Sequence, residues 1–286
     1  AAAAIGSFFA GTIGTLFVAV SAPTLASFAL SFGPAEYFSL VMLGLITAMV
    51  LTSGSLLKSF GMATLGLLLG MVGTDVNSGA ARFTFGTPNL LDGLDFVVIA
   101  TGMFGIGDVL ANMESEHTRS SIIAKVRRLL PTREDWKRMT APILRGTGLG
   151  VVLGVLPGAG LILASFASYA LEKKVSRHAS ELGTGAIEGV AGPEAANNAA
   201  AQTSFIPMLT LGLPATATMA LMIGALMIQG IQPGPEMLVQ QPELFWGLVV
   251  SMWVGNLMLI LLNLPMIGVW VRMISLPYHF LFPMVC

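Results

Sequence analysis

Charged residues are scarce in this chain of 286 residues. Asp, Glu, Lys and Arg make up 10% of it, whereas 55% is hydrophobic. A soluble domain carries about 25% charged residues, so this composition excludes an ordinary water-soluble domain and predicts an integral membrane protein. The net charge of −1 gives no indication of partners.

Cysteine and the common catalytic motifs are also nearly absent. Cys286 is the only cysteine, which excludes a disulfide within the chain. The sequence contains no zinc-protease motif, phosphate-binding loop or nucleophile elbow, and its three histidines are scattered. We therefore expect no enzyme activity and no cofactor. The chain starts without Met and ends inside an apolar run, so we expect an internal part of a longer protein.

Long apolar runs are what the sequence does have. They are close to 20 residues long and rich in Leu, Ala, Met and Gly, which is typical of membrane-spanning helices. The fold class we predict is all-α, a polytopic transmembrane helical protein with re-entrant or broken helices. Its unbroken spans are expected at 5–31, 36–52, 55–73, 96–112 and 244–271.

Two further apolar segments, 146–170 and 203–230, are each interrupted by proline and glycine residues. In lipid every backbone N–H and C=O needs a partner, so such a break survives only where protein or a water-filled cavity covers it. A helix that restarts after a break points its positive N-terminal end into it, which suits a carboxylate. The alternative is a plain kink between packed helices.

A polar block lies between the breaks. Asn amides bind a carboxylate through N–H₂ and a cation through the carbonyl oxygen, and Glu194 has the chemistry to ligate a cation or carry a proton. The alternative is a cytoplasmic loop whose polar groups meet water. The predicted ion-coupling residues are Glu194, Asn197 and Asn198. The predicted substrate-binding residues are Pro157, Gly158, Ala159, Gly160, Asn197, Asn198, Thr203, Ser204, Gly212, Pro214 and Thr216.

The basic residues set the expected orientation. Eight of the fourteen fall between Arg119 and Arg145, so region 119–145 is predicted to be cytoplasmic. A second cluster, Lys173, Lys174 and Arg177, stays on that side only if segment 146–170 enters the membrane and returns as a hairpin. The alternative is a tilted single span with a weak outside cluster. We predict transmembrane helices in 1–112, a cytoplasmic basic amphipathic linker in 113–145, and a transport-type repeat in 146–286.

A Gly-x-Gly-Asp sequence at 105–108 matches the core of intramembrane aspartyl proteases. Those enzymes need a second membrane aspartate that shares a proton. The other candidates, Asp75, Asp92 and Asp95, fall in a loop on the opposite side from Asp108. The protease remains an alternative that this topology disfavours.

Several long motifs resemble the large membrane subunit of the tripartite tricarboxylate transporter family (TctA-type). They cover nearly the whole chain, which is similar to the central and C-terminal part of that subunit. The motifs are Gly154–Gly160, Ala164–Lys174, Gly185–Val190, Pro193–Glu194, Asn197–Ala201, Phe205–Pro214, Gly73–Asn77, Arg82–Gly86 and Gly230–Pro235.

The resemblance implies a carrier subunit of a secondary active importer in the bacterial inner membrane. It implies two partners, a small membrane subunit and a periplasmic solute-binding protein that delivers carboxylates. It also implies an ion gradient, of sodium or protons, as the driving force. A passive pore or scaffold subunit is the alternative from another functional class.

Two positions depart from the family pattern. Ala195 stands where a Ser often precedes Ala-Asn-Asn, and Ala215 stands where a Gly usually follows the proline of the second break. Substrate or ion preference is expected to differ accordingly.

Overall fold

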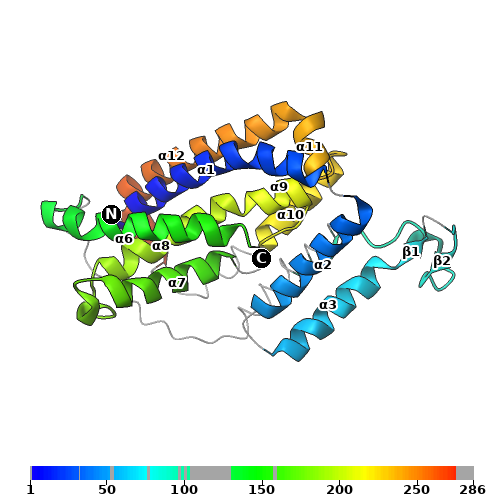
Figure 1. Cartoon of the computed structure of the whole chain (residues 1–286), viewed down its shortest axis with the longest axis horizontal. Coiled ribbons are helices and arrows are strands. Elements are labelled where there is room, and N and C mark those ends of the chain that lie inside the picture. Colours follow the sequence, from blue (N-terminus) through cyan, green and yellow to red (C-terminus); the bar gives the residue numbers. More distant parts are fainter. Residues whose placement is uncertain are drawn as a thin grey trace.

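The computed structural model describes residues 2–31, 33–51, 55–75, 78–95, 98–99, 102–103, 130–156 and 160–274. Apart from a two-residue strand pair, the regular elements of these residues are helices (Figure 1). The main helices are α1 (Ala2–Ala29), α2 (Pro34–Leu51), α3 (Leu56–Gly70), α6 (Arg133–Gly154), α7 (Gly160–Val175), α8 (Glu188–Thr203), α9 (Phe205–Leu211), α10 (Ala217–Ile228), α11 (Pro235–Gln240) and α12 (Pro242–Ile274). The predicted all-α fold class is confirmed.

Helix α8 is the centre of the molecule and packs against α1, α6 and α7. Its alanines are strong helix formers with small side chains, so neighbouring backbones can approach closely. On α6, the face toward α8 carries a glycine in each of three successive turns, Gly146, Gly150 and Gly154. A side chain at Gly146 would overlap the Gly192 carbonyl, and one at Gly150 would overlap the Ala196 carbonyl. Small residues thus decide how α6 and α8 pack.

Helices α6 and α7 form an antiparallel hairpin. Thr132 with Asp135 three residues later is a sequence signature of a helix N-cap, and the two residues make a reciprocal capping box at the start of α6. The helix then continues to Gly154, into the first broken segment. Near the open end of the hairpin, Arg145 on α6 contacts Glu172 on α7 at 2.7 Å. This pairing across the hairpin brings the basic residues at the start of α6, Arg133, Lys137 and Arg138, to the same end as Lys173, Lys174 and Arg177.

The second break is observed where the sequence predicts it. Helix α9 ends at Leu211, and Gly212 adopts the left-handed conformation (φ 68°) while its amide donates to the Met208 carbonyl. Helix α10 begins at Ala217 after Thr216, whose hydroxyl accepts from the Met219 amide at 3.2 Å. The intervening residues are not helical.

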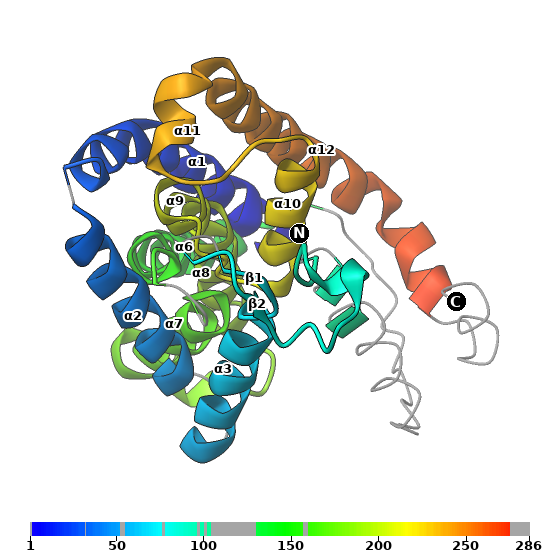
Figure 2. The same cartoon turned by 90° about the vertical axis from the view of Figure 1, so that its right-hand side faces the viewer.

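The two longest helices, α1 and α12, lie side by side along the outside of the bundle (Figures 1 and 2). Among the described residues, they supply the two stretches long and apolar enough to cross a bilayer, Ala2–Ser27 and Pro242–Val269. The largest apolar cluster joins both helices to α9, α10 and α11, with Val18, Ile206, Met219 and Phe245 among its buried members.

Helices α2 and α3 form an antiparallel pair beside the main bundle (Figure 1). The polar loop after α3 contains strands β1 (Gly73–Thr74) and β2 (Ala81–Arg82) and the short helix η1 (Pro88–Leu90). Most of the predicted span 96–112, including Asp108, lies outside the described residues. So do most of the linker, at 113–129, and the end of the chain from residue 275.

Candidate functional site

The first break brings the start of α7 against the end of α6. Gly160, the first residue of α7, is buried, and a Cβ atom there would lie 2.7 Å from the Leu153 carbonyl oxygen and 3.1 Å from Gly154 Cα. This approach requires glycine, as predicted from the Pro-Gly pattern. Pro157, Gly158 and Ala159 lie outside the described residues.

The second break turns the chain back toward the middle of the molecule. Gly212 lies against the Pro233 carbonyl near α11. Helix α11 is at the opposite end of the bundle from the start of α6 and the end of α7, which together form the hairpin base (Figure 1). Residues 213–216, which include the partly buried Pro214, then return along α9, and Met219 reaches Ser204. The N-terminal end of α10 therefore points into the bundle. Thr216, a predicted substrate ligand, is the N-cap of this helix.

Both restarting helices begin beside the junction of α8 and α9. A side chain at Gly154, which adjoins Gly160, would overlap the Thr203 hydroxyl. On the other side, Ser204 Oγ lies 3.3 Å from Met219 Sδ at the start of α10. Thr203 and Ser204 are fully buried, and their hydroxyls donate to the carbonyls of Ala199 and Ala201. Two positive helix ends thus converge on one point of the chain.

A polar seam runs between α8 and α1. Asn198 Nδ2 donates to Ser7 Oγ at 2.8 Å and lies 3.3 Å from Glu194 Oε1, and Ser7 Oγ donates to the same carboxylate at 3.3 Å. Two turns along, Thr15 Oγ1 donates to Gln202 Oε1 at 3.4 Å. The structure therefore brings Glu194 and Asn198 together, as the sequence predicts.

The partners of this seam are not among the predicted site residues. Ser7 and Thr15 lie in a predominantly apolar span, yet both are buried and hydrogen-bond to polar side chains of α8. On the outer side, Asn256 of α12 donates to Thr12 Oγ1 at 2.9 Å and to the Phe8 carbonyl at 2.8 Å. The available signal was the spacing of Ser7, Gly11 and Thr15, which recurs every four residues and marks one helix face.

Asn197 does not join the seam. It is partly exposed, on a side of α8 that also carries the half-exposed Val190. Both departures from the family pattern are buried in apolar surroundings, Ala195 among Ala10, Met139 and Ile143, and Ala215 in the large cluster. Their first effect is therefore on packing.

The hairpin base carries a separate ionic cluster. Arg138 donates to Glu188 from Nε at 2.8 Å and Nη2 at 2.9 Å, and to Glu181 at 2.8 Å, while His178 Nδ1 lies 2.8 Å from Glu188 Oε1. Burial raises the pKa of Glu188, but the hydrogen bond from Arg138 and smaller favourable contacts outweigh it, so that pKa is below its ordinary value. The same hydrogen bonds raise the pKa of Arg138.

Comparison with known proteins adds two relatives from Agrobacterium vitis. One, described as an uncharacterized 52.8 kDa protein in the TAR-I ttuC' 3' region, is 56% identical over 283 residues, which is 99% of this chain and 56% of that protein. The other, described as an uncharacterized protein in the TAR-II ttuC' 3' region, is 64% identical over 134 residues, 47% of this chain and 55% of that protein. The chain thus spans little more than half of the first relative's length.

No solved structure matches the chain. The profile of the family described as Tripartite tricarboxylate transporter TctA family matches residues 1–286, the whole chain, which confirms the resemblance inferred from the motifs. Since that family is a transporter family, transport across a membrane follows for its members. The chain belongs to the tripartite tricarboxylate transporter TctA family.

Proposed function

We propose that this chain is part of the carrier subunit of a secondary active importer for tricarboxylate-type organic anions. An ion gradient drives the import, and a periplasmic solute-binding protein supplies the substrate. The subunit works in the bacterial inner membrane with a small membrane subunit, and its basic region 119–145 faces the cytoplasm. Family membership supports this assignment at the level of a tricarboxylate transporter membrane subunit.

The convergence of two helix N-termini at Thr203–Ser204 is the observation that carries the proposal. The first amides of a helix have no partner within it and carry a positive partial charge. Paired helix ends that meet inside a membrane protein are suited to an anionic substrate. Gly160 and Gly212 support this role, because one permits close backbone approach and the other the left-handed turn.

The polar seam is the proposed coupling site. Glu194 Oε1 and Ser7 Oγ lie within hydrogen-bonding distance of one another and of Asn198 Nδ2. A carboxylate, a hydroxyl and an amide carbonyl offer the hard oxygen ligands that a sodium ion takes, and a carboxylate also accepts a proton. We propose Asn197, on the partly exposed side of α8, as a substrate ligand, because it does not join the seam.

Counterflow in proteoliposomes tests the proposal against a passive pore. The full-length subunit is reconstituted with its small membrane partner in proteoliposomes that contain unlabelled citrate, and labelled citrate is added outside together with the solute-binding protein. A carrier accumulates label transiently above equilibrium and responds to an imposed sodium or proton gradient. Label that only equilibrates, with no response to either gradient, would identify a pore and contradict the proposal.

A matched pair of asparagine variants tests the seam. Asn198→Ala is expected to abolish uptake while membrane insertion and melting temperature stay near wild type. Asn263→Ala is the control, because the Asn263 amide donates only to the Leu259 carbonyl of its own helix within the described structure. Wild-type uptake by Asn198→Ala, or equal losses in both variants, would count against the assignment.

A further inference from the structure

A cavity of about 430 Å³ lies at the base of the α6–α7 hairpin, away from the proposed transport site. Helix α6 forms one wall, and the loop after α7 together with the start of α8 forms the other. Four of its ten lining residues are Lys or Arg, and Ala141, Pro142 and Val175 contribute apolar surface. The lining residues are Lys137, Arg138, Ala141, Pro142, Arg145, Val175, Ser176, Arg177, His178 and Glu188.

The Lys and Arg residues of this cavity differ in whether they have a carboxylate partner. Arg138 and Arg145 have carboxylate partners, in Glu188 with Glu181 and in Glu172 respectively. Lys137 and Arg177 are exposed and form no ion pair within the part of the chain that the structure describes. Positive charge therefore exceeds negative charge around the cavity.

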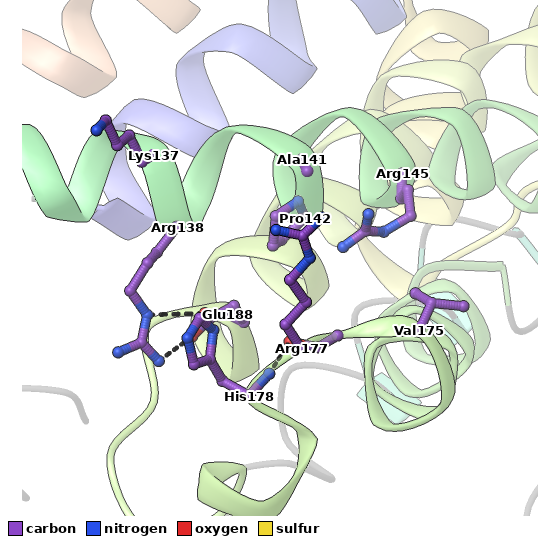
Figure 3. Close-up of a pocket in the computed structure, with 10 residues that line it drawn as sticks. Lys137, Arg138, Ala141, Pro142, Arg145, Val175, Arg177, His178 and Glu188 are labelled. Carbon is purple, nitrogen blue, oxygen red and sulfur yellow. Dashed lines mark hydrogen bonds and ion pairs between the residues drawn. The ribbon is translucent and has the colours of Figure 1, made fainter.

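Figure 3 shows how these groups are aimed. The Arg177 side chain extends from the loop toward Pro142 on α6, and the guanidinium of Arg145 points toward the same space. Arg138 is held at the other side of Arg177 by its hydrogen bonds to Glu188. Arg177 is thus the guanidinium that faces this space without a carboxylate partner among the described residues, and a bound anion would supply the missing negative charge.

We propose that this cavity binds a phosphate group that accepts hydrogen bonds chiefly from Arg177 and also from Arg145, while Lys137 adds positive charge at the edge of the cavity. Guanidinium groups match phosphate oxygens with paired, charge-assisted hydrogen bonds. The favoured source is an anionic phospholipid headgroup. Basic pockets between membrane helices bind such headgroups.

The surface next to the cavity supports the lipid source. On α6, Leu144 and Val152 are more than half exposed, and on α7 the same holds for Ile162 and Phe166. Leu144 adjoins the cavity residue Arg145, and the other three lie farther along the hairpin toward the first break. A phosphate in the cavity would thus leave acyl chains beside exposed apolar side chains.

Native mass spectrometry of the full-length protein in detergent tests the site. Phosphatidylglycerol, phosphatidylcholine and inorganic phosphate are titrated in separate arms. Arg177→Gln is expected to weaken phosphatidylglycerol binding on the order of five- to tenfold, and Lys137→Gln is expected to act in the same direction. Arg133→Gln is the matched control, because Arg133 is exposed on the same helix and does not line the cavity.

The arms separate the sources of the phosphate. Weakened phosphatidylglycerol binding without an effect of inorganic phosphate supports the headgroup, and competition by inorganic phosphate supports a free anion at the same site. Equal effects of Arg177→Gln and Arg133→Gln would mean that binding depends on overall surface charge and not on the cavity. That result would overturn the proposal. Undiminished binding by Arg177→Gln, or no binding by the wild type, overturns it as well.

Discussion

At the residue scale, the buried carboxylate of Glu172 on α7 forms an ion pair with Arg145 on α6. It is completely buried on α7, and its partner Arg145 is about one-third exposed on α6, with bonds of 2.8 and 2.7 Å. A buried charge is tolerated only when it is paired and hydrogen-bonded. This pair consequently holds α6 and α7 in one register.

Glu172→Gln is expected to destabilise the fold by about 3 kcal/mol, because it leaves Arg145 partly buried without its counter-charge. The double variant Glu172→Gln/Arg145→Met is expected to recover most of that loss, since an unpaired charge is removed with its partner. Melting temperatures of the detergent-solubilised protein measure both. A single variant as stable as wild type would contradict the structural role of the pair.

The lowered pKa of Glu188 gives a pH dependence. Its folded pKa lies below the unfolded value, so its stabilising contribution is present above that unfolded value, about pH 4, and is lost as pH falls through the folded pKa. Melting temperature is expected to decrease below about pH 4 in wild type and to change less in Glu188→Gln. Glu134→Gln is the control, because Glu134 is exposed at the start of α6. An identical acid response in all three proteins would refute the prediction.

At the element scale, the contact between α6 and α8 depends on glycine rather than on large apolar side chains. Gly146, Gly150 and Gly154 each leave room for backbone of α8, and the buried alanines of α8 complete the contact. In a bilayer, such close packing supplies van der Waals attraction that lipid cannot replace. The position of Thr203 next to Gly154 therefore follows from this contact.

Gly150→Val is expected to separate α6 from α8 and to destabilise the protein by ~3 kcal/mol, because its side chain would overlap the Ala196 carbonyl. Gly148→Val is the matched control on the same helix, since a Cβ atom there meets nothing within 4 Å. Monodisperse yield and melting temperature distinguish the two. Similar losses in both variants would mean that helix propensity, not packing, sets the effect.

At the scale of the whole molecule, the basic hairpin base and α11 lie at opposite ends of the bundle (Figure 1), and Gly212 contacts Pro233 just before α11. If the chain sits in the membrane with its helices across the bilayer, the two ends face different compartments. The sequence predicts that the basic end is cytoplasmic.

Cysteine labelling in inverted and right-side-out vesicles tests this arrangement. In a Cys286→Ser background, Thr132→Cys and Arg177→Cys are expected to react from the cytoplasmic side, and Gln241→Cys from the other. All three positions are exposed. Permeabilised vesicles, in which every site should react, are the control. Labelling of Thr132→Cys and Arg177→Cys from opposite sides would rule out the hairpin in the membrane.

The sequence by itself determined the helical class, the second break, the N-cap at Thr132 and the family. These features depend on local chemistry. Proline lacks an N–H group, and Gly212 adopts the left-handed conformation that ends a helix. The apolar composition reflects a lipid bilayer as the surroundings of the chain. Local chemistry also placed Glu194 and Asn198 together, because they lie four residues apart on one helix.

Only the tertiary structure decided which partners these residues have. Ser7 and Glu194 are 187 positions apart in the chain, and no local pattern joins them. Likewise the Arg145–Glu172 pair and the convergence of α7 and α10 at Thr203–Ser204 depend on where α6, α8 and α9 pack. Helix spacing in the sequence defines a face, but contacts between faces depend on the packing of small residues over the whole bundle, and this packing is a property of the assembled chain.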